Sequence, residues 1–227
     1  MPNRPLLLGH RGARATRSIP ENTIASFDLA LKHGCDGFEF DVRRTEDAAA
    51  VLCHDPKSGG IQIARAIRSD VPHLALLEEV LARYARSAFL DIELKVSGLE
   101  ESVLATLRQH SFKPGFVVSA FFPEILLQLR ARDPEVPLGI IADRPAHLSL
   151  WRELPVQYVI PEYKLATQQL IEDVQAARKK IFVWTVNEKE AMVEFAAWGV
   201  DAIISDDTEL LVRTLGDPRA GRRQPEA

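Results

Sequence analysis

Short apolar stretches alternate with longer amphipathic stretches along the whole chain. The short stretches are rich in β-branched residues and are bounded by turn residues, which is typical of strands. Some of them, such as Phe116-Val117-Val118, are apolar on both faces, as expected for a parallel sheet covered by helices. We therefore predict eight strands, at Leu6–Gly9, Gly37–Val42, Ala88–Leu94, Phe116–Ser119, Leu138–Ile141, Tyr158–Pro161, Ile181–Val186 and Ala202–Ser205.

The stretches between these strands have the period of amphipathic helices. Asn22 and Asn187 stand where helix N-caps are expected, and Gly34 and Gly199 follow two of the predicted C-termini. The predicted helices span residues 22–33, 76–86, 99–110, 123–132, 146–153, 167–179, 188–198 and 207–215.

Eight strand–helix units in a chain of 227 residues match a (β/α)8 barrel, for which roughly 250 residues is typical. A doubly wound open sheet is the alternative, but it usually has fewer strands, and the sequence lacks its G-x-G-x-x-G fingerprint. We predict an α/β fold with one (β/α)8, or TIM, barrel domain over residues 1–215. Residues 216–227 are rich in Gly, Pro and Arg and predict a disordered tail.

Composition and charge limit the classes of partner and the location that we expect for the protein. The chain has 28 basic and 32 acidic residues, so its net charge of −4 gives no electrostatic reason to expect nucleic acid or an anionic membrane surface. The apolar run Leu6–Leu8 is too short for a signal peptide or a membrane span, so we expect a cytoplasmic protein without stable membrane association. Cys35 and Cys53 have no metal-ligand spacing and are expected to be buried thiols.

Residues that could carry chemistry gather at the carboxyl ends of the predicted strands, where active sites of (β/α)8 barrels lie. His54 follows a short extra strand at Ala50–Cys53, and residues 54–75 are expected to form a loop over the mouth of the site. The other candidates at these ends are His10, Arg11, Glu39, Asp41, Glu93, Lys95, Phe121 and Trp184.

The types of these residues point to phosphate ester hydrolysis. The carboxylates Glu39, Asp41 and Glu93 would repel one another unless a cation lay between them, and ligation by oxygen alone favours Mg²⁺ or Ca²⁺ over zinc. Fixed cations such as arginine and lysine bind phosphate. His10 and His54 carry side chains that titrate near neutral pH, as proton transfer requires.

Seven motifs, in this order and at these spacings, resemble the glycerophosphodiester phosphodiesterase family of the bacterial cytoplasmic type. The resemblance runs from Leu6 to about Leu215. The motifs are Gly-His-Arg-Gly (9–12), Pro-Glu-Asn-Thr (20–23), Gly-Phe-Glu-Phe-Asp-Val (37–42), His-Asp (54–55), Ile-Glu-Leu-Lys (92–95), Val-Trp-Thr-Val-Asn (183–187) and Gly-Val-Asp-Ala-Ile-Ile-Ser-Asp (199–206).

The resemblance implies a TIM barrel that hydrolyses glycerophosphodiesters to sn-glycerol 3-phosphate and an alcohol. It implies an acid/base pair (His10 and His54), ligands of a divalent metal (Glu39, Asp41 and Glu93) and phosphate contacts (Arg11 and Lys95). The chain departs from the family at residues 46–50, where Lys-Asp-Gly is usual, and in the short segment after Asp55. The alcohol that leaves is therefore left open.

Several assignments stay open at this stage. Trp184 and Phe121 are expected to wall the substrate pocket, Asn22 to cap its helix, and Arg43 to be solvated. Which histidine is the acid is not fixed by strand order, and we take His10 as the acid and His54 as the base. The rival functions are a lysophospholipase D and a barrel that binds a phosphorylated metabolite without turnover.

Overall fold

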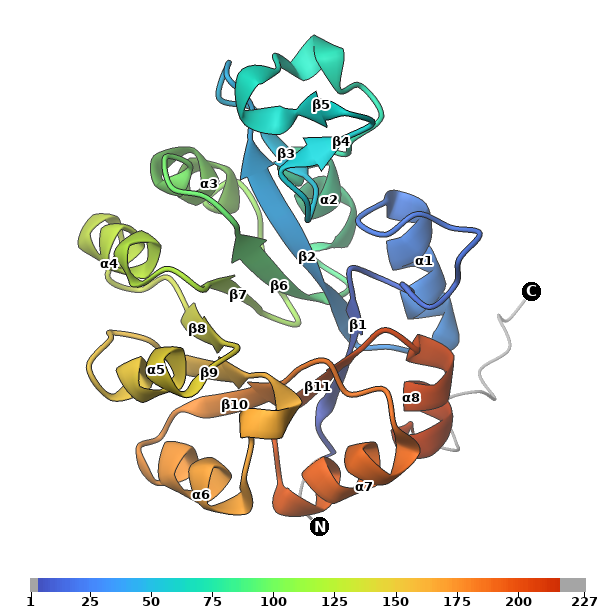
Figure 1. Ribbon diagram of the computed structural model, residues 1–227, viewed down its shortest axis with the longest axis vertical. Helices are drawn as coiled ribbons and strands as arrows, with labels where there is room; N and C mark the ends of the chain where they lie inside the picture. Colours follow the sequence, from blue (N-terminus) through green and yellow to red (C-terminus); the bar gives the residue numbers. More distant parts are fainter. Residues whose placement is uncertain (1–3, 217–227) are drawn as a thin grey trace.

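Eight parallel strands close into a barrel in the computed structural model, which describes residues 4–216 (Figure 1). The strands pair in the order β1-β2-β6-β7-β8-β9-β10-β11, and β1 also pairs with β11, which closes the ring. The predicted barrel is thus confirmed, with a strand at each of the eight predicted places. These strands are β1 (Leu6–His10), β2 (Gly37–Arg44), β6 (Phe89–Leu94), β7 (Phe116–Ala120), β8 (Leu138–Ala142), β9 (Tyr158–Pro161), β10 (Lys180–Val183) and β11 (Ala202–Ser205).

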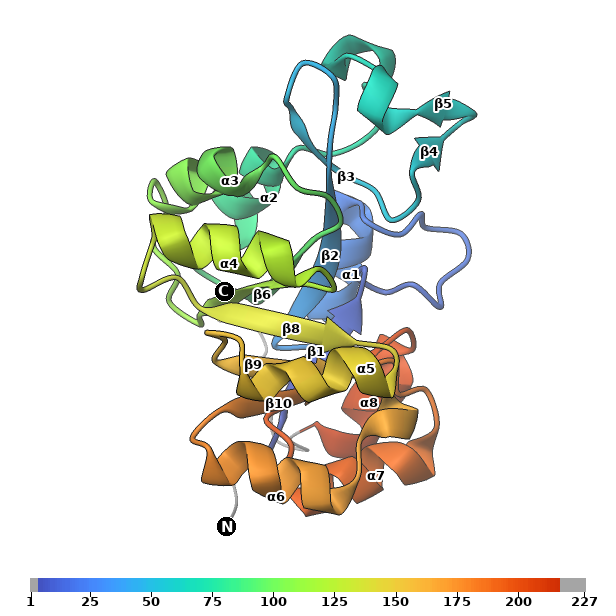
Figure 2. The same ribbon diagram turned by 60° about the vertical axis from the view of Figure 1, so that its left-hand side comes forward.

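Helices surround the barrel, as Figures 1 and 2 show. The eight predicted helices all lie close to their predicted places, but helix 146–153 divides into an α-helical and a 3-10 part, and the short η4 was not predicted. The helices are α1 (Ile24–His33), α2 (Leu77–Tyr84), α3 (Glu100–Leu107), α4 (Pro123–Arg132), α5 (Pro145–Leu148) with η3 (Ser149–Arg152), η4 (Tyr163–Leu165), α6 (Gln168–Ala176), α7 (Lys189–Trp198) and α8 (Thr208–Leu215). No helix of residues 4–216 is long and apolar enough to cross a membrane.

Alternate residues of the strands face two separate apolar cores. Leu7 belongs to the large core between the barrel and its helices, whereas Leu8 belongs to a small core with Phe89, Phe182 and Ile204. Because side chains two apart on a strand point the same way, His10 lies one step beyond Leu8 on the inward face. The polar site is therefore built on top of an apolar floor.

The register between β2 and β6 places the acidic residues side by side. Gly37 is opposite Phe89, and a Cβ added at Gly37 would lie 1.9 Å from the Phe89 carbonyl oxygen, so only glycine fits there. From this point the strands run in step, with Glu39 opposite Asp91 and Asp41 opposite Glu93. The close strand contact at the bottom of the barrel thus fixes the carboxylates at its top.

Both predicted asparagine caps are wrong. The N-cap of α1 is Thr23, whose side chain accepts from the Ser26 amide, and the N-cap of α7 is Glu188. Asn22 has φ 56° and turns its side chain toward Asp41 instead. The predicted C-terminal glycines, Gly34 and Gly199, do adopt the left-handed conformation.

The chain between β2 and α2 forms a small projection. The predicted extra strand is β3 (Ala50–Leu52), which pairs antiparallel with β2. Residues 54–75, predicted as a loop, contain β4 (Lys57–Ser58), β5 (Ile61–Gln62), η1 (Ile63–Arg65) and η2 (Arg68–Asp70). Figures 1 and 2 show this segment projecting beside the barrel, so it flanks the mouth and does not cover it. The predicted tail lies outside the described residues, apart from Gly216.

Candidate active site

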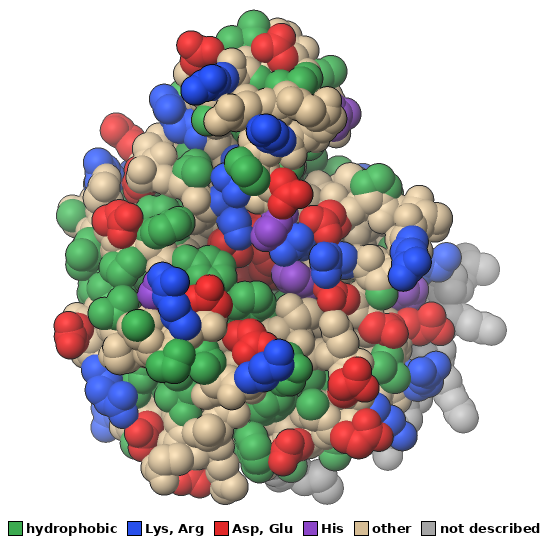
Figure 3. Space-filling model, in the orientation of Figure 1, with side chains coloured by type: hydrophobic (Ala, Val, Ile, Leu, Met, Phe, Trp, Pro, Cys, Tyr) green, Lys and Arg blue, Asp and Glu red, His purple; other side chains and the backbone are tan. Residues whose placement is uncertain are grey.

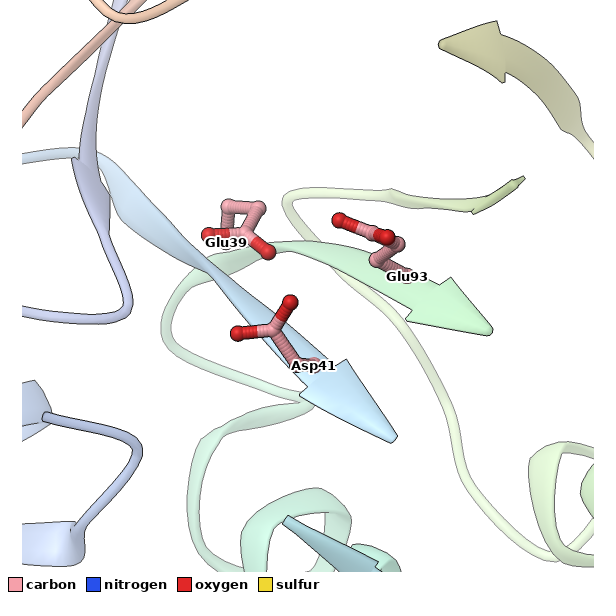
Figure 4. A group of neighbouring side chains, drawn as sticks. All are labelled: Glu39, Asp41 and Glu93. Carbon is pink, nitrogen blue, oxygen red and sulfur yellow. The ribbon is translucent and has the colours of Figure 1, made fainter. Parts of the chain in front are cut away.

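Three buried carboxylates converge at the carboxyl ends of β2 and β6. Glu39 and Asp41 come from β2 and Glu93 from β6, and Figure 4 shows their oxygens directed toward one another. One oxygen from each lies within 4.8 Å of the others, and all three residues are buried. This is the trio that the sequence predicted as metal ligands.

The electrostatics of the trio fit a cation. Burial raises the pKa of Glu39 well above its usual value, and the neighbouring Asp41 raises it further. Burial and Asp41 likewise raise the pKa of Glu93 to about 7. Glu39 Oε1 is buried without a hydrogen-bond partner among the described residues. A hard divalent ion would satisfy this oxygen and offset the repulsion, so the donor set fits Mg²⁺ or Ca²⁺.

Two basic side chains lie against the trio. Lys95 Nζ is 2.6 Å from Glu93 Oε1 and 3.3 Å from Asp41 Oδ1, and Arg11 Nε is 3.3 Å from Asp41 Oδ2. The Arg11 amide also donates to Glu39 at 3.0 Å. Burial alone would raise the pKa of Asp41, but these cations outweigh burial and hold it below its usual value. Both predicted phosphate-binding residues thus lie where a phosphate next to the trio would meet positive charge.

His10 is held by Asp206, the last residue of the motif at 199–206. Its Nδ1 is 2.7 Å from Asp206 Oδ1, and its Nε2 is 3.8 Å from Glu39 Oε2. Asn187 donates to the other Asp206 oxygen at 2.9 Å, and Arg14 to Oδ1 at 3.1 Å. Burial lowers the pKa of His10, and Asp206 opposes part of that effect. The ring therefore points a neutral Nε2 at the site.

His54 lies at the outer edge of the same pocket. Its Nδ1 is 2.8 Å from Asp55 Oδ1, and its carbonyl oxygen accepts from the Arg43 guanidinium at 2.8 and 2.6 Å. The expectation that Arg43 is a solvated charge is therefore wrong, because it anchors the backbone of His54. The nearby Cys53 is half-buried, which contradicts the expectation of a buried thiol, whereas Cys35 is buried.

The central pocket has a polar rim and an apolar wall (Figure 3). Phe121 and Trp184 meet edge to face at 5.7 Å between ring centroids, and Lys95 Nζ lies 5.4 Å from the centre of the Phe121 ring. Eight of the nine predicted site residues line this pocket, namely His10, Arg11, Glu39, His54, Glu93, Lys95, Phe121 and Trp184. Asp41 lies beneath them, in contact with both basic side chains.

The loop before α1 contributes two further residues to the site, Glu21 and Asn22. Asn22 donates to Asp41 Oδ2 at 2.8 Å and accepts from the Asp41 amide at 3.1 Å. Glu21 binds Arg11 at 2.8 Å and Arg14 at 2.6 Å. The signal for both was the Pro-Glu-Asn-Thr motif, which helix capping alone does not explain.

Comparisons with known proteins agree with this geometry. A chain from Caldanaerobacter subterraneus subsp. tengcongensis named glycerophosphodiester phosphodiesterase is 28% identical over 242 residues, covering 92% of this chain and 97% of that protein. One of the same name from Bacillus altitudinis is 27% identical, covering 91% and 96%.

Solved structures share the fold. A glycerophosphodiester phosphodiesterase from Thermotoga maritima matches with a TM-score of 0.80 and 23% identity, over 93% of this chain and 98% of that one. An Oleispira antarctica phosphodiesterase, solved with its product sn-glycerol-3-phosphate, matches with a TM-score of 0.82 and 24% identity, over 94% and 98%. The model of the glycerophosphoryl diester phosphodiesterase family matches residues 10–61 and 74–210, which include the trio, both histidines and both basic residues. The chain therefore belongs to the glycerophosphoryl diester phosphodiesterase family.

Proposed function

We propose that the protein hydrolyses glycerophosphodiesters to sn-glycerol 3-phosphate and an alcohol, with His10 and His54 as an acid/base pair. The observation that carries the proposal is the meeting of both histidines with a carboxylate trio and two cations in one pocket. Family membership and the names of the relatives support the same reaction.

Each side chain has a task that follows from its surroundings. Arg11 and Lys95 bind the phosphoryl oxygens and stabilise the negative charge that grows on them in the transition state. Asp206 fixes the His10 ring so that Nε2 is free to exchange a proton with the substrate or with the nucleophile. Phe121 and Trp184 offer an apolar wall to the glycerol carbons.

Glu39, Asp41 and Glu93 would hold the divalent ion, Mg²⁺ or Ca²⁺. When bound, such an ion supplies Lewis-acid polarisation of a phosphoryl oxygen. A binding protein for phosphometabolites would need the cations but no pair of histidines, so the histidines favour an enzyme.

The test is release of glycerol 3-phosphate, measured with a coupled dehydrogenase over a panel of headgroups. We expect activity with Mg²⁺ or Ca²⁺, loss of activity with EDTA, and strong loss in His10→Ala and His54→Ala. Turnover of lysophospholipids in preference to water-soluble diesters would favour the lysophospholipase D. Tight product binding without turnover of any diester would favour the binding protein.

Three expectations complete the proposal. A cytoplasmic location and the absence of nucleic-acid or stable membrane partners remain predictions from the sequence, as does one domain over residues 1–215. Fractionation of the cells that make the protein tests the location, and limited proteolysis tests the domain boundary.

A further inference from the structure

Arg14 joins two carboxylates that each contact a residue of the site. It lies between the motifs at 9–12 and 20–23. Its Nε donates to Glu21 Oε2 at 2.6 Å, and its Nη1 donates to Asp206 Oδ1 at 3.1 Å. With its other oxygen, Glu21 accepts from Arg11 Nη1 at 2.8 Å. Asp206 Oδ1 also accepts from His10 Nδ1 at 2.7 Å. One guanidinium thus connects the partner of a phosphate-binding residue with the partner of a proposed acid/base residue.

We propose that Arg14 is a positioning residue, which aligns the phosphate-binding Arg11 and the imidazole of His10 without touching the substrate. This inference rests on the proposed function. Arg14 is not among the described residues that line the central pocket, whereas Arg11 and His10 are. Any effect of Arg14 on turnover therefore has to pass through Glu21 and Asp206.

The contact with Glu21 keeps Arg11 available to the phosphate. Because Arg14 occupies one Glu21 oxygen, Arg11 is bound through the other oxygen alone. Burial would raise the pKa of Glu21, but hydrogen bonds from Arg11 and Arg14 outweigh burial and lower it, so Glu21 stays ionised. An ionised carboxylate with both oxygens available forms a bidentate pair with a guanidinium. Without Arg14, Glu21 would therefore compete with the phosphate for the N–H groups of Arg11.

The contact with Asp206 acts on His10. One Asp206 oxygen accepts from both the His10 imidazole and the Arg14 guanidinium, and the other accepts from Asn187. The Ala15 amide also donates to the Asp206 carbonyl oxygen at 3.0 Å, which holds the loop before α1 against the end of β11. Loss of Arg14 would remove one of the three side-chain hydrogen bonds that fix the carboxylate. Because Asn187 remains, we expect a smaller effect on kcat than on KM.

Arg14 lies at the surface, so its contacts matter more for alignment than for stability. Its side chain is 41% exposed, and exposed ion pairs contribute little to the free energy of folding. A hollow of about 470 Å³ opens beside it, and Arg17 and Asp207 also line this hollow. A small cation therefore has room to enter when the Arg14 side chain is removed.

The experiment compares Arg14→Ala with Arg17→Ala, which removes the same charge from the same hollow. The substrate is glycerophosphoethanolamine, and affinity for glycerol 3-phosphate is measured by calorimetry with Mg²⁺ present. We expect Arg14→Ala to raise KM and the product Kd about fivefold, the upper end for an exposed ion pair, and to lower kcat about twofold. Arg17→Ala should change each value by less than about twofold. The Tm of both variants should stay within about 2 °C of that of the unmodified protein, because exposed substitutions change stability little.

A double variant tests whether Arg14 acts through Glu21. In Glu21→Gln the competing group is neutral, so adding Arg14→Ala should change the product Kd by less than about twofold. Millimolar guanidinium should restore part of the affinity lost in Arg14→Ala, and an equal concentration of NaCl should not. Unchanged KM, Kd and kcat in Arg14→Ala, equal effects in Arg17→Ala, or full additivity in the double variant would overturn the inference. Failure of the unmodified protein to hydrolyse any glycerophosphodiester would instead overturn the proposed function.

Discussion

Asp206 controls the state of His10 in the site. Its Oδ1 accepts from His10 Nδ1, while Asn187 holds its second oxygen and its backbone amide. The carboxylate therefore selects the tautomer with the proton on Nδ1 and leaves Nε2 as the reacting atom. Without it, the imidazole would rotate and populate both tautomers, although the binding of substrate would change little.

Asp206→Asn should thus lower kcat and leave KM nearly unchanged. We expect a loss of at least about tenfold, since a general acid or base contributes roughly 10²–10⁴-fold. The nitrogen chemical shifts of His10 should show a mixture of tautomers, which a purely structural role would not produce. The matched control is Asp207→Asn, because Asp207 caps α8 and asparagine caps equally well. Equal loss in both variants would contradict the role of Asp206.

Lys95 competes with a metal for the same carboxylates. It lies 2.6 Å from Glu93 and 3.3 Å from Asp41, and these charges raise its pKa against the opposing effect of burial. Lys95→Met should lower kcat/KM by at least about tenfold, because a charge-assisted contact to phosphate contributes roughly 1.5–3 kcal/mol. Metal affinity, measured by calorimetry, should stay the same or rise. Lys164→Met is the control, since Lys164 lies over the Tyr163 ring outside the central pocket lining. If Lys95→Met instead lost metal affinity and kept its affinity for glycerol 3-phosphate, Lys95 would serve the metal site and not the phosphate.

At the residue scale the sequence predicted the groups at strand ends but not their partners. Glu39, Glu93 and Lys95 were predictable because the end of each strand places its inward residues in one pocket. The pair of His10 and Asp206 joins residues 196 positions apart, so neither pattern nor spacing reveals it. Asn22 was assigned to the wrong task because a side chain that can cap a helix can equally well bind a carboxylate.

The loop before α1 links helix and site through two adjacent residues with separate tasks. Thr23 caps α1, whereas Asn22 makes two hydrogen bonds to Asp41. Because Asn22 has φ 56°, glycine can replace it without backbone strain and removes only the amide.

The two adjacent substitutions should therefore separate stability from metal affinity. Thr23→Ala should lower the free energy of unfolding by about 1 kcal/mol, as loss of a cap does, and leave metal binding unchanged. Asn22→Gly should weaken metal binding, because Asp41 loses the group that fixes its carboxylate. Thermal unfolding and calorimetric titration with Mg²⁺ measure the two effects. Equal metal affinity of Asn22→Gly and the unmodified protein would show that the basic side chains alone position Asp41.

The helices and strands were predicted correctly where the hydrophobic period along the chain is strong. The prediction failed in the projection between β2 and α2. The buried strands and amphipathic helices have the patterns that a barrel demands. Residues 54–75 were predicted as a loop because β4 and β5 have two residues each, too few to show a period.

The buried carboxyl groups at the site lower the stability of the folded protein when no metal is bound. Burial raises the pKa of Asp91 and of Glu93 to about 7 each. In the absence of metal these two carboxyl groups therefore bind more protons in the folded state than in the unfolded state between about pH 4 and pH 7. Their contribution to the free energy of unfolding falls as pH rises through this window, and the loss is complete above the folded pKa values. A divalent ion held by Glu39, Asp41 and Glu93 would take the place of the proton on Glu93.

Metal should consequently stabilise the protein most at alkaline pH. At a Mg²⁺ or Ca²⁺ concentration of 100 times Kd the gain is about 2.7 kcal/mol, or roughly 5–10 °C in Tm for a protein of this size. At pH 5 protons compete for the carboxylates, so the shift in Tm should nearly vanish. Glu39→Gln removes one ligand and one repelling charge. It should therefore raise the Tm of the metal-free protein at pH 8 while reducing the response to metal. A metal-induced shift that is equal at pH 5 and pH 8, or that survives in Glu39→Gln, would place the ion away from the carboxylate trio.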